Sequence, residues 1–315
     1  MEDAGYFKVK EHTGSDALNI GGALAIDNAT ISGNSATLNL GNGGGVMTVG
    51  GTVTINASTI SGNSAARAGG GIENNLGTVT LTTVTVGGST GPDGNDAGVN
   101  GGGLHVSGAG TTNVNGGSFE NNIAAQEGGG LWNASGVMTI NGTTISDNSA
   151  DAGNNSLNDQ GGGGVFNIGG TVDIDNAMIT GNSATLNLGN GGGVMTVGGT
   201  VTIDGSTISG NDSARAGGGI ENNVGTVTLT NVTVGGSLAA DGNSAGVNGG
   251  GVHVTGAGTT NINGGAFENN VAAQEGGGLW NGSGTMTIDA TAITDNLASG
   301  SGSDQGGGGV FNAGG

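Results

Sequence analysis

The apolar and polar residues of this chain alternate in very short segments. In GTVTI (51–55), Val53 and Ile55 face one side of an extended chain while the threonines between them face the other. A second short apolar segment, TISGN, follows at 59–63. This period-two alternation predicts short β-strands, and the apolar positions show no helical period. We therefore expect an all-β protein.

The strand pattern recurs in units that each begin with three glycines and an apolar residue. The triplets open at 43, 69, 101, 128 and 162, and again at 191, 217, 249, 276 and 307. A degenerate first member at 14 makes the units 26 to 34 residues long. In addition, the segment NSATLNLGNGGGVMTVGGTVTI at 34–55 recurs unchanged at 182–203, so the chain contains a duplication with an offset of 148 residues.

A unit of this size cannot bury its few apolar side chains alone, whereas stacked units can. The pattern predicts a right-handed, single-stranded parallel β-helix of about ten coils, spaced about 4.8 Å apart. We expect two regions: an N-terminal segment, 1–13, that forms a cap or docking strand or simply frays, and a β-helix, 14–315. The β-helix comprises super-repeats 14–161 and 162–306 and the start of a further coil, 307–315.

Composition changes this picture only in what it excludes. The 315 residues include 77 Gly but one Pro and no Cys, which excludes collagen and disulfide scaffolds. A net charge of -20 with only four Lys and Arg argues against a nucleic-acid partner. A hydrophobic content of 33% would suggest disorder, but the repeats override that inference. Because no apolar run is long enough, no membrane-spanning segment is expected.

Two repeated residue types are expected to shape the corners. Gly fits a corner that needs a positive φ or a close backbone approach. An Asn column can stack its amides along the axis; its members are Asn34, Asn63, Asn122, Asn148, Asn182, Asn211, Asn270 and Asn296. In two units, GGS after Val86 and Val234 replaces this Asn. We expect all length variation to fall between the Asn and the next triplet, so that long loops emerge along one edge.

The paired signatures GG-x-(Ile/Leu/Val) and Phe-x-x-Asn, the latter as FENN at 119–122 and 267–270, resemble the repeats of polymorphic outer membrane proteins of bacteria. The resemblance covers nearly the whole chain and implies a β-helix at the cell surface that acts as a passenger rod or adhesin. Elsewhere Ile replaces Phe, and Gly replaces Ala in the triplet.

Catalysis is not expected. Polysaccharide-cleaving β-helices that resemble pectate lyases need clustered carboxylates with Arg or Lys, and only Arg67 and Arg215 serve the repeats. His105 and His253 stand in equivalent units without an evident Asp or Ser partner in sequence. We therefore expect a protein that is not an enzyme, with a pectate-lyase-like polysaccharide-binding or cleaving protein as an alternative.

Calcium is the one cofactor that the residues suggest, because acidic Gly/Asn loops offer several oxygen ligands. The candidate ligands are Asp93, Asn95, Asp96, Asp241 and Asn243. The competing interpretation is that these acids only keep the rod soluble.

Two outward columns suggest recognition. The first column is formed by the residue that follows the apolar residue of each triplet unit. Four of its members are aromatic, and we expect their rings either to stack on sugars or to be covered by loops; these are Trp132, Phe166, Trp280 and Phe311. Thr-x-Thr pairs, such as Thr52 and Thr54, resemble the ice-binding faces of antifreeze β-solenoids, although Asn113 and Asp173 interrupt the column.

These observations predict a non-catalytic structural or adhesive rod or filament element, extracellular or on a bacterial cell surface. The expected partners are other copies stacked end to end or edge to edge, flanking repeats of a longer chain, and a glycan or cell-surface receptor. Ice binding remains an alternative.

Overall fold

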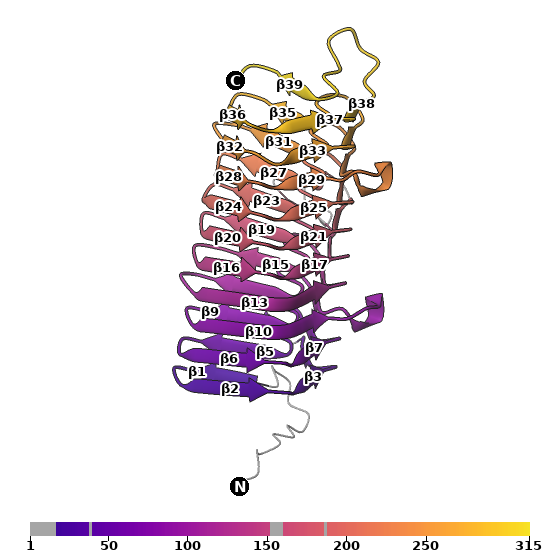
Figure 1. Ribbon diagram of the computed structural model, residues 1–315. Coiled ribbons are helices and arrows are strands. Elements are labelled where there is room, and N and C mark those ends of the chain that lie inside the picture. Colours follow the sequence, from indigo (N-terminus) through magenta and orange to yellow (C-terminus); the bar gives the residue numbers. More distant parts are fainter. Residues whose placement is uncertain (1–16, 38–39, 152–159, 186–187) are drawn as a thin grey trace.

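The short strands predicted from the alternation form the faces of a parallel solenoid (Figure 1). The computed structural model describes residues 17–37, 40–151, 160–185 and 188–315. Every paired strand runs parallel to its neighbours, and each strand between the two end coils pairs with the equivalent strands one coil before and one coil after. The expected all-β parallel β-helix of about ten coils is confirmed.

Sheet A contains the strand that follows each glycine triplet. Its members are β1 (Ala17–Ile20), β5 (Val46–Val49), β9 (Ile72–Asn75), β12 (Leu104–Ser107), β15 (Leu131–Asn133), β19 (Val165–Ile168), β23 (Val194–Val197), β27 (Ile220–Asn223), β31 (Val252–Thr255), β35 (Leu279–Asn281) and β39 (Val310–Asn312).

Sheet B has two faces joined by a bend. The first face contains β2 (Ala23–Asp27), β6 (Thr52–Asn56), β10 (Thr78–Gly87), β13 (Thr111–Glu120), β16 (Val137–Asn141), β20 (Thr171–Asp175), β24 (Thr200–Asp204), β28 (Thr226–Thr230), β32 (Thr259–Asn263) and β36 (Thr285–Asp289). The second face contains the ends of β10 and β13 with β3 (Thr30–Ser32), β7 (Thr59–Ser61), β17 (Thr144–Ser146), β21 (Met178–Thr180), β25 (Thr207–Ser209), β29 (Thr233–Gly235), β33 (Ala266–Glu268) and β37 (Ala292–Thr294).

Sheet C closes each coil with strands of two residues. These are β4 (Ser35–Ala36), β8 (Ser64–Ala65), β11 (Asp96–Ala97), β14 (Ile123–Ala124), β18 (Ser149–Ala150), β22 (Ser183–Ala184), β26 (Asp212–Ser213), β30 (Ser244–Ala245), β34 (Val271–Ala272) and β38 (Leu297–Ala298). Two single-turn 3-10 helices, η1 (Gly91–Asp93) and η2 (Ala239–Asp241), lie between sheets B and C.

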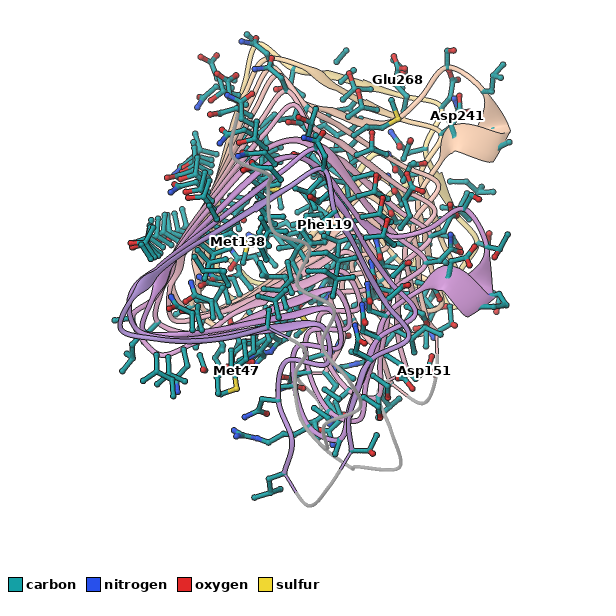
Figure 2. All side chains as sticks on the ribbon, turned by 90° about the horizontal axis from the view of Figure 1, so that it is seen from below. Met47, Phe119, Met138, Asp151, Asp241 and Glu268 are labelled. Carbon is teal, nitrogen blue, oxygen red and sulfur yellow. The ribbon has the colours of Figure 1, made fainter. Side chains whose placement is uncertain are left out.

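The coils wind in the right-handed sense. In Figure 1 the near strands of sheet B run from left to right while the chain climbs from its N-terminal to its C-terminal end. The end-on view in Figure 2 agrees, because Met47, Met138, Phe119 and Asp151, which lie on successive faces, follow one another clockwise as the chain recedes from the viewer.

The interior is a stack of aliphatic columns. Val53 pairs in register with Val79, and Ile55 pairs with Leu81, and all four side chains are fully buried. The alternating threonines lie on the outer surface, as the sequence predicts. Because every coil repeats this register, the core is continuous from coil to coil.

The glycine triplet forms the corner between sheets C and A, where the backbones pack too closely for a Cβ. A Cβ on Gly129 would lie 2.4 Å from the Ser149 carbonyl oxygen, and one on Gly130 would lie 2.6 Å from the Gly164 oxygen. Gly128 has a φ of +63°, which other residues rarely adopt. The abundance of Gly therefore reflects tight packing.

Candidate functional site

A ladder of asparagine amides runs inside the solenoid next to the glycine corner. Each Asn before the last donates its backbone N–H and its side-chain Nδ2 to the Oδ1 of the Asn one coil on, over 2.9 to 3.1 Å. Nδ2 also donates to a backbone carbonyl of a preceding coil, as in Asn148 to Phe119. The ladder contains Asn34, Asn63, Asn95, Asn122, Asn148, Asn182, Asn211, Asn243, Asn270 and Asn296.

The expected gaps in this ladder, and the expected position of two insertions, are wrong. β10 runs on through Val86 to Gly87, and the turn with η1 precedes Asn95, which then fills the ladder position. Asn243 does the same after η2. Extra residues can be inserted as a turn just before the ladder Asn. The ladder is preserved because its buried hydrogen bonds need an amide at that position, whatever the length of the preceding turn. Insertions therefore occur at two corners.

The outward column of sheet A forms the candidate site. Strand register places one residue of each coil above the next, because β5, β9, β12 and β15 pair in parallel. The column reads Met47, Glu73, His105, Trp132, Phe166, Met195, Glu221, His253, Trp280 and Phe311. Within it, the sequence Glu, His, Trp, Phe occurs twice.

The histidines have partners that the sequence reading missed. His105 Nδ1 lies 2.7 Å from Glu73 Oε2, and the two side chains are 5% and 2% exposed. Ser107 donates its hydroxyl to the other oxygen, Glu73 Oε1, over 2.5 Å. In the second copy His253 and Thr255 bind Glu221 in the same way, at 2.6 and 2.9 Å. The carboxylate that satisfies each histidine comes from the preceding coil, 32 residues earlier.

Each imidazole also stacks on an indole ring. The centroids of His105 and Trp132 are 4.2 Å apart with 14° between the planes, and Phe166 stacks on the other face of Trp132. Trp132 Nε1 donates to Glu127, a residue of the segment that precedes the triplet. In the second copy His253 stacks on Trp280 in the same geometry.

The first glycine of the triplet and the residue just before it pack against this column in the described coils. A Cβ on Gly101, whose φ is +64°, would lie 2.6 Å from the Cβ of His105. The residues just before the triplets are themselves joined in parallel, since Ala68 bridges to Asn100 and Asn100 to Glu127. The column is thus a second, smaller core beside the aliphatic one.

Burial determines what the four candidate recognition rings can contact. Phe166 is fully buried and Trp132 is 9% exposed, so neither presents an open face for a sugar. Trp280 and Phe311 are partly exposed. In the first copy, therefore, the rings pack against neighbouring side chains.

The hydroxyl of Ser107 donates to the glutamate and is not bonded to the imidazole, so the group is not a nucleophile with its base. The two carboxylate oxygens are occupied by the histidine and the hydroxyl. What this arrangement supports is a buried hydrogen bond between side chains of adjacent coils, which ties those coils together.

The structure does not assemble the calcium candidates. Asn95 and Asn243 are fully buried and their Oδ1 atoms each accept two ladder hydrogen bonds. Asp93 accepts from Thr90 within the η1 turn, and Asp241 accepts from a backbone N–H in the η2 turn. Within the residues that the structure describes, no three His, Asp or Glu side chains form a group that could hold a metal ion.

Asp96 lies on the other side of the ladder, in sheet C. Burial, with a smaller contribution from the charge of Asp151, raises the pKa of its carboxyl. Burial also raises the pKa of Asp212 at the equivalent position, although hydrogen bonds from Ser244 and Ser213 oppose the shift.

Threonines of sheet B line up across coils more continuously than the Thr-x-Thr pairs suggest. The first outward position of the strands carries Thr in most coils, including Thr111, Thr171 and Thr259, which the pairs omit. Figure 2 shows the side chains of such columns as aligned combs on the outer surface.

No protein-family model matches the chain, and neither a curated protein nor a solved structure is significantly similar to it. Within the described part of the chain, no helix is long and apolar enough to cross a membrane. The segment 1–13, expected to form a cap or docking strand, lies outside the described residues.

Proposed function

We propose that this chain is a non-catalytic structural or adhesive rod, extracellular or attached to a bacterial cell surface. The observation that supports this role is the unbroken ladder from Asn34 to Asn296, which crosses every coil in one register. Three sheets and an internal amide ladder resist both bending and extension, because each coil is tied to the next along its whole path.

A non-catalytic role is supported by the environment of the two His–Glu pairs. These side chains are almost fully buried, and they form hydrogen bonds with each other and with a neighbouring hydroxyl. The surface location is supported by the resemblance of the GG-x-(Ile/Leu/Val) and Phe-x-x-Asn signatures to polymorphic outer membrane protein repeats. The resemblance rests on these short motifs.

The role is tested by shape and location. Small-angle X-ray scattering of the purified chain should give an elongated particle, and antibodies to the folded rod should label intact cells. A compact or expanded particle, or labelling only after cell lysis, would contradict the proposal. Fibres whose length grows with protein concentration would favour a filament element over an adhesin that binds a glycan or receptor.

Calcium stabilisation is a separate part of the proposal and is tested separately. Millimolar calcium should raise the melting temperature by several degrees if the acidic turns at Asp93 and Asp241 bind it. Magnesium at the same concentration serves as the control. An unchanged melting temperature would remove calcium from the proposal and leave the rod intact.

A second candidate function, ice binding, is favoured by the registered Thr columns of sheet B. The hydroxyl and methyl groups repeat at the coil spacing on a flat face, so they could order water in a regular array. The chain would then shape ice crystals, and Thr202→Lys with Thr228→Lys on that face should abolish the effect. Normal ice growth in the presence of the wild-type chain would exclude it.

A further inference from the structure

One edge of the rod carries no charged residue, although the chain has a net charge of -20. We call it the A/B edge: the last outward residue of each sheet A strand (or, after β15 and β35, the residue that follows the strand), the turn, and the first residue of the next sheet B strand. It comprises 20–23, 49–52, 75–78, 107–111, 134–137, 168–171, 197–200, 223–226, 255–259 and 282–285. Its residues are Gly, Ala, Ser, Thr, Asn and aliphatic ones, and the acids of the chain lie elsewhere.

The same edge presents an apolar stripe to solvent. Ile20 is 72% exposed, Leu76 62%, Val137 45%, Ile168 41% and Val224 51%. Half-buried valines in register with the two isoleucines extend the stripe in the adjacent coils. Isolated exposed aliphatic residues are ordinary, but a row of them along one uncharged edge typically marks a contact surface.

Two of these side chains are held in a strained backbone. Leu76 has a φ of +64° and Val224 a φ of +55°, a region that bulky and β-branched residues avoid. Gly occupies the same turn in other coils, for example Gly50 and Gly198 at +74° and +70°. The exposed fractions of Leu76 and Val224 show that burial in the core offsets little of this strain. A strained, exposed apolar residue is a reason to infer a function.

The A/B edge is also free of obstruction. In Figure 1 it is the left side of the rod, where the turns between sheets A and B stack in a straight line. The turns that contain η1 and η2 project from the opposite side. A straight partner of similar length could therefore lie along the whole edge.

We propose that the A/B edge binds the A/B edge of a second copy of this chain, side by side. Two strongly acidic rods repel each other everywhere except where their carboxylates are furthest apart, and this edge provides that approach. The duplication repeats the stripe after 148 residues except at Val137, so apolar residues can meet apolar residues along most of the contact. The inference rests on the proposed rod and names the surface through which rods associate.

The contact is narrow, so one pair of rods associates weakly. The edge is about 48 Å long and one or two side chains wide. The area that it can bury is therefore smaller than the roughly 800 Å² per partner that a stable dimer buries. Sedimentation velocity over about 10 μM to 1 mM protein should show a reversible monomer–dimer equilibrium. Raising the salt concentration should strengthen it, because salt screens the repulsion between the acidic faces.

The decisive variant is Leu76→Gly with Val224→Gly. Gly suits the positive φ, so this variant should melt at or above the wild-type temperature while its dimer dissociation constant rises about tenfold or more. A purely structural role for the two residues would instead lower the melting temperature. The matched control, Leu238→Ala with Met178→Ala, removes side chains of similar exposure from outside the A/B edge and should leave association unchanged.

Cross-linking gives an independent readout, because the chain has no cysteine of its own. Ala134→Cys, on the A/B edge, should form an intermolecular disulfide faster than Ser209→Cys on the second face of sheet B. A wild-type chain that stays monomeric at 1 mM, or association that the edge variant leaves intact, would overturn the inference. An elongated monomer would then leave the proposed rod standing, whereas a compact monomer would contradict the rod itself.

Discussion

At the residue scale, the eight inner asparagines of the ladder, from Asn63 to Asn270, combine full burial with four or more hydrogen bonds each. Asn148 accepts from Asn122 through Oδ1 and donates to Asn182 and to the Phe119 carbonyl. Removing one amide leaves buried donors and acceptors on both neighbouring coils without partners. Because unsatisfied buried groups cost far more than a hydrogen bond contributes on average, the ladder should be sensitive to single substitutions.

Asn148→Ala should therefore lower the free energy of unfolding by roughly 3 kcal/mol, measured by urea denaturation. Asn296→Ala is the control, since Asn296 is partly exposed and its loss leaves fewer buried groups unpaired. The control should cost clearly less. Equal losses for the two variants would show that the ladder does not act as a buried network.

A pH dependence is expected from Asp96. Its folded-state pKa is raised, so its contribution to stability is greatest below the unfolded pKa, near 3.8, and is lost as the pH rises through the folded value. At neutral pH the charged carboxylate therefore destabilises the fold. Asp96→Ser, which introduces the residue found at Ser64 one coil earlier, should stabilise at pH 7 by less than about 1 kcal/mol, because solvent screens the half-exposed group.

The gain from Asp96→Ser should disappear as the pH falls below about 4, where the wild-type carboxyl is protonated. Thermal melts across this range measure it, and Asp96→Asn should follow the same profile if charge is the cause. A gain that persists at pH 3 would mean that the carboxylate charge is not responsible.

At the element scale, much of the fold follows from repetition alone. The triplet sets the register of sheet A, and alternation such as that of Val53 and Ile55 determines which side chains enter the core. The positions predicted for the η1 and η2 insertions are wrong. The spacing of the repeats gives the number of residues in a coil, but not the corner at which the extra residues are inserted. Asn95 was consequently assigned to a calcium site.

The His–Glu pairs are not predicted by local sequence patterns because their members are 32 residues apart. The sequence nevertheless contains the information that identifies them. Once the triplets are aligned, Glu73 and His105 occupy the same position in successive coils, and parallel pairing makes such residues direct neighbours. In a solenoid, side-chain partners are found by comparing equivalent positions between repeats.

The covered column can be tested through one of these pairs. His105→Ala leaves the buried Glu73 carboxylate without its main partner and should cost about 3–5 kcal/mol. Replacing both residues with apolar side chains that the column already contains, Glu73→Met with His105→Phe, should recover most of that loss. The same substitutions at Glu221 and His253 provide the internal replicate. A double variant as unstable as the single one would show that the pair is not simply a buried ion pair.

At the scale of the whole molecule, the duplication makes the rod divisible in register. The segments 34–55 and 182–203 are identical, so deletion of 34–181 joins the chain without a new sequence at the junction. Every strand of the shortened rod keeps an equivalent neighbour, because the deletion removes five complete coils. It should fold with β-rich circular dichroism and be shorter by about 24 Å, as measured by small-angle scattering.

The control for this deletion removes 34–189, a segment of similar length that is not a whole number of coils. It also takes Asn182 and β22 out of the junction coil, which then has no ladder amide and no sheet C strand, so this rod should be less stable than the one shortened in register. If both deletions folded equally well, coil register would not govern stability. If neither folded, the stacked coils would not be separable units, and the repeat energetics assumed for the rod would be wrong.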